Sequence, residues 1–170
     1  MSFNGRDQEQ GFTNEMFENA EALIVVLDKE GRFCRFNRAC EKLSGYTQGE
    51  VLGKCPWDTV LPPEDAETIR INAFDALVNN PQALVGQYTN YWLAKNGKKF
   101  FLDWSNSILL DAEGNVEYVL SIGTDATERQ RVEEELRQYE HIVSSTTDML
   151  ALLDTEFVYL AVNEAYPSAF

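Results

Sequence analysis

Hydrophobic and polar positions near the start of the chain follow the pattern of a β-hairpin. Residues 23–27 are all apolar and include β-branched side chains, which is typical of a buried strand. Residues 32–36 alternate between polar and apolar side chains, as in a strand with one face in water. The polar segment 28–31 between them ends in glycine and indicates a turn. The pattern predicts two paired antiparallel strands.

Short helices are predicted after this hairpin. Asn37 is placed to cap a helix over residues 38–44, and Gly45 is placed to end it. A longer helix is expected over residues 66–78, after two prolines. Residues 79–81, Asn-Asn-Pro, should stop that helix, because the residue before a proline avoids the helical conformation.

Strand patterns return in the second half of the chain. Strands are expected over residues 87–94, 99–110 and 116–123. The first two are joined through Asn96-Gly97, the strongest short-range signal for a hairpin turn. Two strands, several short helices and a three-stranded meander predict an α+β fold with one antiparallel sheet.

A charged helix with an apolar seam is expected over residues 128–143. Val132, Leu136, Tyr139 and Val143 follow one another at spacings typical of coiled-coil core positions, with charged residues between them. The seam covers only about two heptads. Two interpretations stay open: a helix that pairs with a partner helix, and a helix that packs on its own sheet.

The pattern of the first hairpin is repeated after this helix. A shift of 126 positions, from Asp28 to Asp154, also brings Asn37 onto Asn163 without a gap. The same shift brings the apolar run 23–27 onto the apolar run 149–153. We therefore expect two similar modules in series, with the chain stopping partway through the second.

The charge balance limits the classes of partner. The chain has 14 basic and 28 acidic residues, and its formal net charge is −14. The field of such a chain repels nucleic acids and anionic membranes. We expect no nucleic-acid partner and no direct membrane contact.

The cysteines and the hydropathy indicate a cytoplasmic protein. The three cysteines form no Cys-x-x-Cys pair, which favours reduced structural thiols. No apolar run approaches the ~18 residues that a membrane span needs. Residues 1–10 also lack the apolar core of a signal peptide.

Several short motifs, in order along the chain, together resemble the PAS family of sensor domains. They are Phe-Asn-Arg-Ala at 36–39, Gly-Tyr-Thr at 45–47 with Glu-Val-Leu-Gly-Lys at 50–54, Pro-Glu-Asp at 63–65, the hairpin segment 92–97, Trp-Ser-Asn at 104–106, and Gly-Thr-Asp-Ala-Thr-Glu-Arg at 123–129. Each motif is weak alone, and the order carries the resemblance.

The resemblance implies a fold and a division of the chain. The fold is a five-stranded antiparallel sheet with short helices on one face, a cavity between them, and a C-terminal amphipathic linker helix. Residues 1–11 are expected to be a flexible segment and residues 12–127 a complete PAS domain. Residues 128–143 would form a signalling helix. Residues 144–170 would be the truncated start of a second PAS domain.

The resemblance also assigns a relay at the exit of the first domain. Asp125-Ala126-Thr127 is similar to the family's Asp-x-Thr motif, from which a helix leads to the next module. Asp125, Thr127 and Arg129 are the expected relay residues. A pair between Asp125 and Arg129 or another basic residue would set the exit angle of the helix, and a surface pair is worth only ~0.2–1 kcal/mol.

Two cofactors known in the family are disfavoured here. The flavin-photoadduct cysteine has no counterpart, because Cys34 comes before the Gly-Tyr-Thr segment and Cys55 falls one position short. Gly123 stands where the photoactive members carry a flavin-contacting glutamine. The only histidine, His141, lies in the linker, which disfavours histidine-ligated haem.

Non-covalent FAD is the cofactor that stays open. Trp57, Trp92 and Trp104 offer stacking surfaces, and Asn90 and Asn106 offer hydrogen bonds to a ring edge. The competing interpretation is that the Trp104 face of its strand simply packs in the core or against a dimer partner, since strands favour aromatic residues. The identity of the ligand is otherwise unknown from the sequence.

The expected function is a sensory, signal-transducing PAS module of a multidomain bacterial-type signalling protein. The module would sense a small ligand or a redox cofactor and would form a homodimer through the linker helix and the N-terminal helix. The dimer would relay the signal to an effector, such as a histidine kinase or a diguanylate cyclase. No catalytic set of residues is found in this segment. The alternative is a ligand-free PAS module for dimerisation or protein interaction.

Overall fold

The computed structural model describes residues 5–79, 87–163 and 165–166. The chain divides into two compact units, Met1–Thr127 and Glu128–Phe170, and each is described by itself. Among the described residues, none of the helices is both long enough and apolar enough to cross a bilayer.

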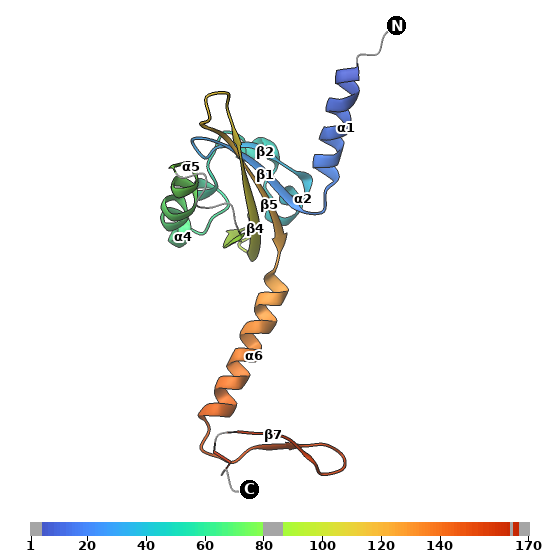
Figure 1. Cartoon of the computed structure of the whole chain (residues 1–170), viewed down its shortest axis with the longest axis vertical. Coiled ribbons are helices and arrows are strands. Elements are labelled where there is room, and N and C mark those ends of the chain that lie inside the picture. Colours follow the sequence, from blue (N-terminus) through green and yellow to red (C-terminus); the bar gives the residue numbers. More distant parts are fainter. Residues whose placement is uncertain (1–4, 80–86, 164, 167–170) are drawn as a thin grey trace. The chain divides into compact units, whose positions relative to one another are not determined.

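The first unit is built on a five-stranded antiparallel sheet (Figure 1). Its strands are β1 (Leu23–Asp28), β2 (Phe33–Phe36), β3 (Gln87–Leu93), β4 (Lys99–Leu110) and β5 (Val116–Asp125), in the order β2-β1-β5-β4-β3. The last strand, β5, therefore lies at the centre, between β1 and β4. The predicted α+β fold with one five-stranded antiparallel sheet is confirmed.

The hairpin between β3 and β4 forms where the sequence predicted it. Gly97 has a φ of 83°, which glycine adopts without strain. The side chain of Asn96 accepts a hydrogen bond from the backbone N–H of Lys98 at 3.0 Å. The Asn-Gly pair therefore supplies both the backbone freedom and the polar contact that this turn needs.

The two faces of the sheet are unequally buried, as β1 shows. Along β1, Leu23, Val25 and Leu27 are buried, and the side chains between them are only partly buried. Period-two alternation places those three on the covered face. The uniform apolar run 23–27 is thus a strand with two unequal faces.

The segments between β2 and β3 are short. They are α2 (Arg38–Ser44), α3 (Gln48–Val51), the 3₁₀ turn η1 (Pro56–Asp58), α4 (Pro63–Ile69), the π-helix η2 (Arg70–Asp75) and α5 (Ala76–Asn79), and α4 and α5 lie on one side of the sheet (Figure 1). As predicted, Asn37 caps α2 by accepting a hydrogen bond from the N–H of Cys40, and Gly45 ends it with a φ of 74°.

The predicted single helix over 66–78 is wrong in detail. The chain is helical there, but six residues adopt the wider π form. Arg70 pairs with Asp75 at 3.0 Å, five positions on, which matches the spacing of a π turn. Of the predicted stop, Asn80 and Pro81 lie outside the described residues.

The described part of the segment that was expected to be flexible, from residue 5 onward, is helical. Helix α1 runs from Gly5 to Asn19. The expectation was based on polarity and on glycine, but Gln and Glu are good helix formers and one glycine costs a helix only about 1 kcal/mol. Polarity here indicates a solvated helix.

The second unit contains one long helix and one hairpin. Helix α6 covers Thr127–Ser145, and strands β6 (Ala151–Leu153) and β7 (Tyr159–Val162) pair antiparallel. The residues of both strands are exposed. A two-stranded hairpin has too little surface to bury for independent stability.

The sequence repeat is matched by a repeat of hydrogen bonds. The Asn37 side chain accepts from the N–H of Ile24 at 3.1 Å and donates to the carbonyls of Phe17 and Ala22 at 3.2 and 2.9 Å. Asn163 accepts from the N–H of Leu150 at 2.9 Å and donates to the carbonyls of Val143 and Asp148 at 3.2 and 2.9 Å. Every partner in the second set is the counterpart, 126 positions on, of its partner in the first.

The turns of the two hairpins match as well. Asp28 accepts hydrogen bonds from the N–H groups two and four residues on, and Asp154 does the same. Both pairs of strands carry a register shift at the same place. The second hairpin therefore repeats the architecture of the first.

Candidate functional site

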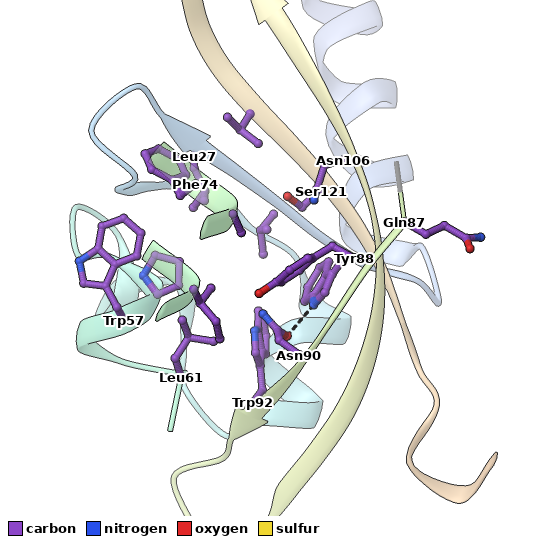
Figure 2. Close-up of a pocket in the computed structure, with 16 residues that line it drawn as sticks. Leu27, Trp57, Leu61, Phe74, Gln87, Tyr88, Asn90, Trp92, Asn106 and Ser121 are labelled. Atoms are coloured by element: carbon purple, nitrogen blue, oxygen red, sulfur yellow. Dashed lines mark hydrogen bonds between the residues drawn. The ribbon is translucent and has the colours of Figure 1, made fainter. Parts of the chain in front are cut away.

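A cavity of about 180 Å³ lies between the sheet and the short helices of the first unit (Figure 2). Its helix side is formed by Pro56, Trp57, Leu61, Ile69, Ala73 and Phe74. Its sheet side is formed by residues of β1, β3, β4 and β5. The π-helix η2 contributes Ala73 and Phe74, and π turns are frequent at functional sites.

The structure brings the five candidate cofactor residues to this one cavity. Trp57 comes from η1, Asn90 and Trp92 from β3, and Trp104 and Asn106 from β4. The four strand residues meet because β3 pairs with β4, and because residues two apart on a strand share a face. Their role in binding a cofactor stays a prediction.

Two of the tryptophans are also part of the core. The rings of Trp92 and Trp104 lie 5.1 Å apart, and Trp92 stacks on Phe36 at 5.9 Å. Trp104 is only 5% exposed. On the opposite wall, Trp57 lies 5.5 Å from Phe74. Trp104 therefore packs in the core and also lines the cavity, so the two interpretations do not exclude each other.

The sheet wall carries polar groups that the sequence reasoning missed. Tyr88 and Ser121 line the cavity beside Asn90 and Asn106 (Figure 2). Tyr88 lies two residues before Asn90, so the alternation of β3 was a signal for it. Burial raises the pKa of the Tyr88 hydroxyl, and the charge of Asp65 adds to this.

Charged groups are absent from the described lining of this cavity: it includes no Asp, Glu, Lys, Arg or His. In the described part of the chain, no group of three or more His, Cys, Asp or Glu side chains is placed to hold a metal ion. The chemistry that the described wall offers is apolar contact and neutral hydrogen bonds.

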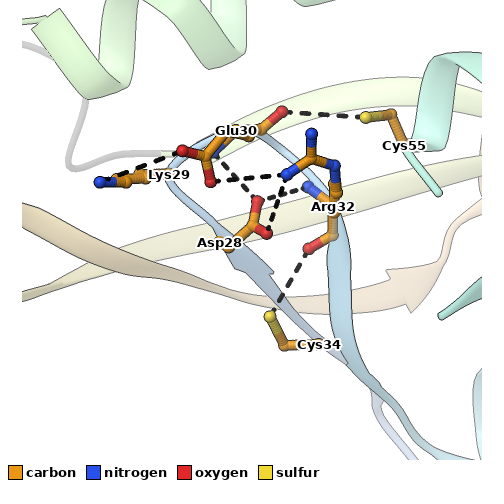
Figure 3. Close-up of polar contacts among 6 residues, drawn as sticks. All are labelled: Asp28, Lys29, Glu30, Arg32, Cys34 and Cys55. Atoms are coloured by element: carbon orange, nitrogen blue, oxygen red, sulfur yellow. Dashed lines mark hydrogen bonds and ion pairs between the residues drawn. The ribbon is translucent and has the colours of Figure 1, made fainter. Parts of the chain in front are cut away.

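The three cysteines lie outside the described wall. Figure 3 shows the Sγ of Cys34 directed to the carbonyl of Arg32 and that of Cys55 to the carbonyl of Glu30, both at 3.8 Å. Burial raises the pKa of both thiols, and it raises the pKa of Cys40 to about 12. A raised pKa keeps a thiol protonated and weakly nucleophilic at neutral pH.

Gly123 provides the room that Trp104 occupies. The two residues pair across β4 and β5, and a Cβ built on Gly123 would lie 2.6 Å from two atoms of the Trp104 ring. Any side chain at position 123 would therefore displace this ring. At the position where the photoactive members carry glutamine, the ring of Trp104 occupies the space of the missing side chain.

The end of β5 is tied to β4 by the exit motif. Asp125 accepts hydrogen bonds from the backbone N–H of Thr127, at 2.9 Å, and from its hydroxyl. The Thr127 hydroxyl accepts from the N–H of Phe101 at 2.9 Å, and the N–H of Ala126 donates to the Phe101 carbonyl at 2.9 Å. Asp125 thus holds Thr127, and Thr127 in turn is bonded to the backbone of Phe101 in β4. Arg129 pairs with Glu133 along α6 at 3.8 Å.

Comparisons with known proteins give the signalling context. The cyclic di-GMP phosphodiesterase PdeR of Escherichia coli (strain K12) is 29% identical over 138 residues, which cover 78% of this chain and 20% of PdeR. The sensor histidine kinase TmoS of Ectopseudomonas mendocina is 27% identical over 123 residues, covering 72% of this chain and 12% of TmoS. The chain therefore spans only a small part of these signalling proteins.

The fold comparison agrees with the sheet and its topology. A crystal structure of a PAS domain from Colwellia psychrerythraea matches with a TM-score of 0.59 and 23% identity, covering 71% of this chain and 98% of that domain. A family model described as PAS fold matches residues 17–131. The predicted resemblance is thereby confirmed for the first module, and the chain belongs to the PAS family.

Proposed function

We propose that the chain is the sensory segment of a larger signalling protein, in which occupancy of the cavity is relayed through β5 to helix α6. The observation that carries the proposal is the contact between Trp104 and Gly123. Trp104 lines the cavity, and its ring fills the space above Gly123, two residues before Asp125. A ligand that moves this ring acts directly on the exit strand.

The hydrogen bonds at the exit support the next step. Leu102 of β4 pairs with Asp125, and the backbone of Phe101 is bonded to Ala126 and Thr127. Trp104 is only two residues further along β4. A shift of β4 against β5 therefore strains the hydrogen bonds from which α6 begins.

The surface of α6 supports a dimeric relay. Val132, Leu136, Tyr139 and Val143 are 42% to 66% exposed. Their spacing is that of a coiled-coil seam, and a second copy of the same helix offers a matching seam. In this proposal the N-terminal helix α1, with exposed Phe12 and Met16, adds to the contact between the copies.

The repeated asparagine supports a second module after α6. In the first module the Asn37 amide holds the carbonyl of Phe17 in α1, and in the second unit Asn163 holds the carbonyl of Val143 in α6. On this basis residues 144–170 begin a second PAS domain. Helix α6 is then both the exit helix of one module and the entry helix of the next.

A test of the relay needs no ligand. Gly123→Ala forces Trp104 to move, because its new methyl group would otherwise lie 2.6 Å from the ring. With spin labels at Gln138→Cys, in a chain whose Cys34 and Cys55 are replaced by serine, this change should alter the distance between labels in the dimer. Thr124→Ala, at the next and exposed position, is the control. An unchanged distance in folded Gly123→Ala dimers would refute the relay.

The exit residues give a second arm of the same experiment. Asp125→Ala removes both bonds to Thr127, so it should uncouple α6 from the sheet and leave the fold intact. In the double variant Gly123→Ala/Asp125→Ala, the distance between the labels should then equal that in Asp125→Ala, because the change at position 123 no longer reaches α6. If the distance between the labels stays the same in all of these variants, the alternative function is favoured, a ligand-free module for dimerisation.

A further inference from the structure

The two walls of the cavity differ in chemistry. The described side chains on the helix wall are all apolar, and Trp57 and Phe74 present rings there. The sheet wall adds hydrogen-bonding groups from Tyr88, Asn106 and Ser121 (Figure 2). A molecule that fits between these walls needs an apolar body and a polar edge.

The polar groups of the sheet wall are available to a ligand. Within the described residues, the side chains of Tyr88, Asn106 and Ser121 make no hydrogen bond, although Ser121 is only 8% exposed. Asn90 accepts a bond from the indole N–H of Trp104 at 2.9 Å. Tyr88 and Asn106 are only partly buried, so their polar groups, like the hydroxyl of Ser121, are open to a hydrogen-bonding partner inside the cavity.

The volume of the described cavity favours a small partner. A volume of about 180 Å³ is close to the roughly 150 Å³ of an engineered apolar cavity that binds benzene. One six-membered ring with a small substituent fits this space. The three fused rings of a flavin need considerably more.

The charge of the wall limits its chemistry. Since the described lining carries no ionisable side chain except the phenol of Tyr88, an ionised ligand would lose its hydration without gaining a counter-charge. The rings on both walls favour an aromatic ligand, because ring pairs gain from offset and edge-to-face contact beyond the area that they bury.

We propose that the cavity binds a neutral, single-ring aromatic molecule that carries one hydrogen-bonding substituent, a phenol being the simplest example. The ring lies between Trp104 and the pair Trp57 and Phe74, and its substituent meets Asn106 and Ser121. The proposal rests on the proposed sensory function, and it names the class of signal that the cavity reads.

Four probes test it by calorimetric titration of the 170-residue chain. Phenol has the ring and the polar edge, toluene lacks the edge, cyclohexanol lacks the aromatic ring, and benzoate is charged. Phenol should bind most tightly, with a dissociation constant about tenfold or more below that of benzoate. Equal binding of benzoate, absence of any binding, or a flavin that co-purifies in the cavity would overturn the proposal.

Two variants sharpen the assignment of the polar edge. Asn106→Leu should lower the affinity for phenol and leave that for toluene within about twofold, because it removes one hydrogen bond only. Ser107→Leu is the control on the same strand, since Ser107 follows Asn106 on β4, is exposed and does not line the cavity. Retained preference for phenol in folded Asn106→Leu would contradict the assignment.

A cavity-filling variant covers the case in which Asn106→Leu fails to fold. Ala73→Leu places an apolar side chain into the helix wall, so it should abolish phenol binding without burying a new polar group. Undiminished binding in this variant would place the phenol elsewhere and refute the proposal. The relay test with Gly123→Ala uses no ligand, so failure of the phenol class and failure of the relay are separate results.

Discussion

The hairpin β1–β2 and the hairpin β6–β7 are the same structure in two different surroundings. Both are held by an asparagine that bridges the start of the hairpin and the preceding helix, and by an aspartate that closes the turn. In the first hairpin Phe33 and Phe36 are buried, whereas the residues of β6 and β7 are exposed. Short-range polar contacts thus suffice to define a hairpin, but its burial comes from the rest of a domain.

The partner strand accounts for this difference. Strand β1 pairs with β5 over six residues, and the short helices cover its inner face. Neither β6 nor β7 has a further strand beside it in the described part of the chain. If the second hairpin begins a PAS domain, the strand that would cover it corresponds to β5.

The largest effect is expected when the same leucine is shortened in both hairpins. Leu27→Ala removes a buried side chain and should lower the free energy of unfolding of the first unit by about 2–5 kcal/mol. Its counterpart Leu153→Ala, at an exposed position, should change this free energy of unfolding by no more than about 0.5 kcal/mol. Urea unfolding measures both. Similar losses in the two variants would mean that the second hairpin is buried in solution.

The two asparagines give the next comparison. Asn37→Ala leaves partly buried backbone groups of Phe17, Ala22 and Ile24 without a partner, so the first unit should lose about 2–3 kcal/mol. Asn163→Ala should leave the main unfolding transition unchanged and speed hydrogen exchange at Leu150. An unfolding midpoint that drops in both variants would show that the units fold together.

The turn positions should respond in opposite directions. Gly31 has a φ of 80°, and a Cβ there would lie 2.3 Å from the ring of Trp57, so Gly31→Ala should destabilise the first unit by about 1–3 kcal/mol. Phe157, its counterpart, has a φ of 64° and is 84% exposed. Phe157→Gly should stabilise the second hairpin by about 1 kcal/mol. Hydrogen exchange of the backbone amides in each hairpin measures both effects. Faster exchange in the second hairpin of Phe157→Gly would contradict the predicted stabilisation.

The smallest effect is a pH dependence confined to the first unit. The hydrogen bond from Lys95 lowers the pKa of Glu50 from 4.5 to about 2. Because the folded-state pKa is the lower one, the contribution is present above the unfolded-state pKa and is lost as the pH falls toward 2. In Lys95→Met, NMR titration should find the Glu50 pKa moved back toward 4.5. A pKa that stays near 2 would assign the shift to Thr47 instead.

The strands could be predicted because their signals are local. The apolar run 23–27, the Asn-Gly turn and the cap at Asn37 each depend on a few neighbouring side chains. The alternation expected over residues 32–36 does not hold, because Phe33 and Phe36 are both buried next to a register shift in the pairing with β1. The N-terminal part of helix α1 and the π turn η2 were missed for the opposite reason. Polarity alone does not separate a solvated helix from a flexible segment, and the π form involves an ion pair, Arg70 with Asp75, that no periodicity indicates.

The site could be predicted in part for a similar reason. The alternation of β3 and β4 collects Asn90, Trp92, Trp104 and Asn106 on one face, so the sequence could name them together. The space above Gly123 could not be foreseen, because it depends on the register that sets this residue opposite Trp104. Register between strands is decided by the whole sheet, beyond the reach of any single motif.

All three tryptophans of the chain line the same cavity. The tryptophan fluorescence of the chain therefore comes entirely from indoles at this site, with Trp92 and Trp104 close enough to exchange energy. An aromatic molecule that enters among them changes the polarity and the quenching around all three emitters at once. The protein thus carries its own optical reporter of occupancy, and no label is needed to follow the filling of the cavity in real time.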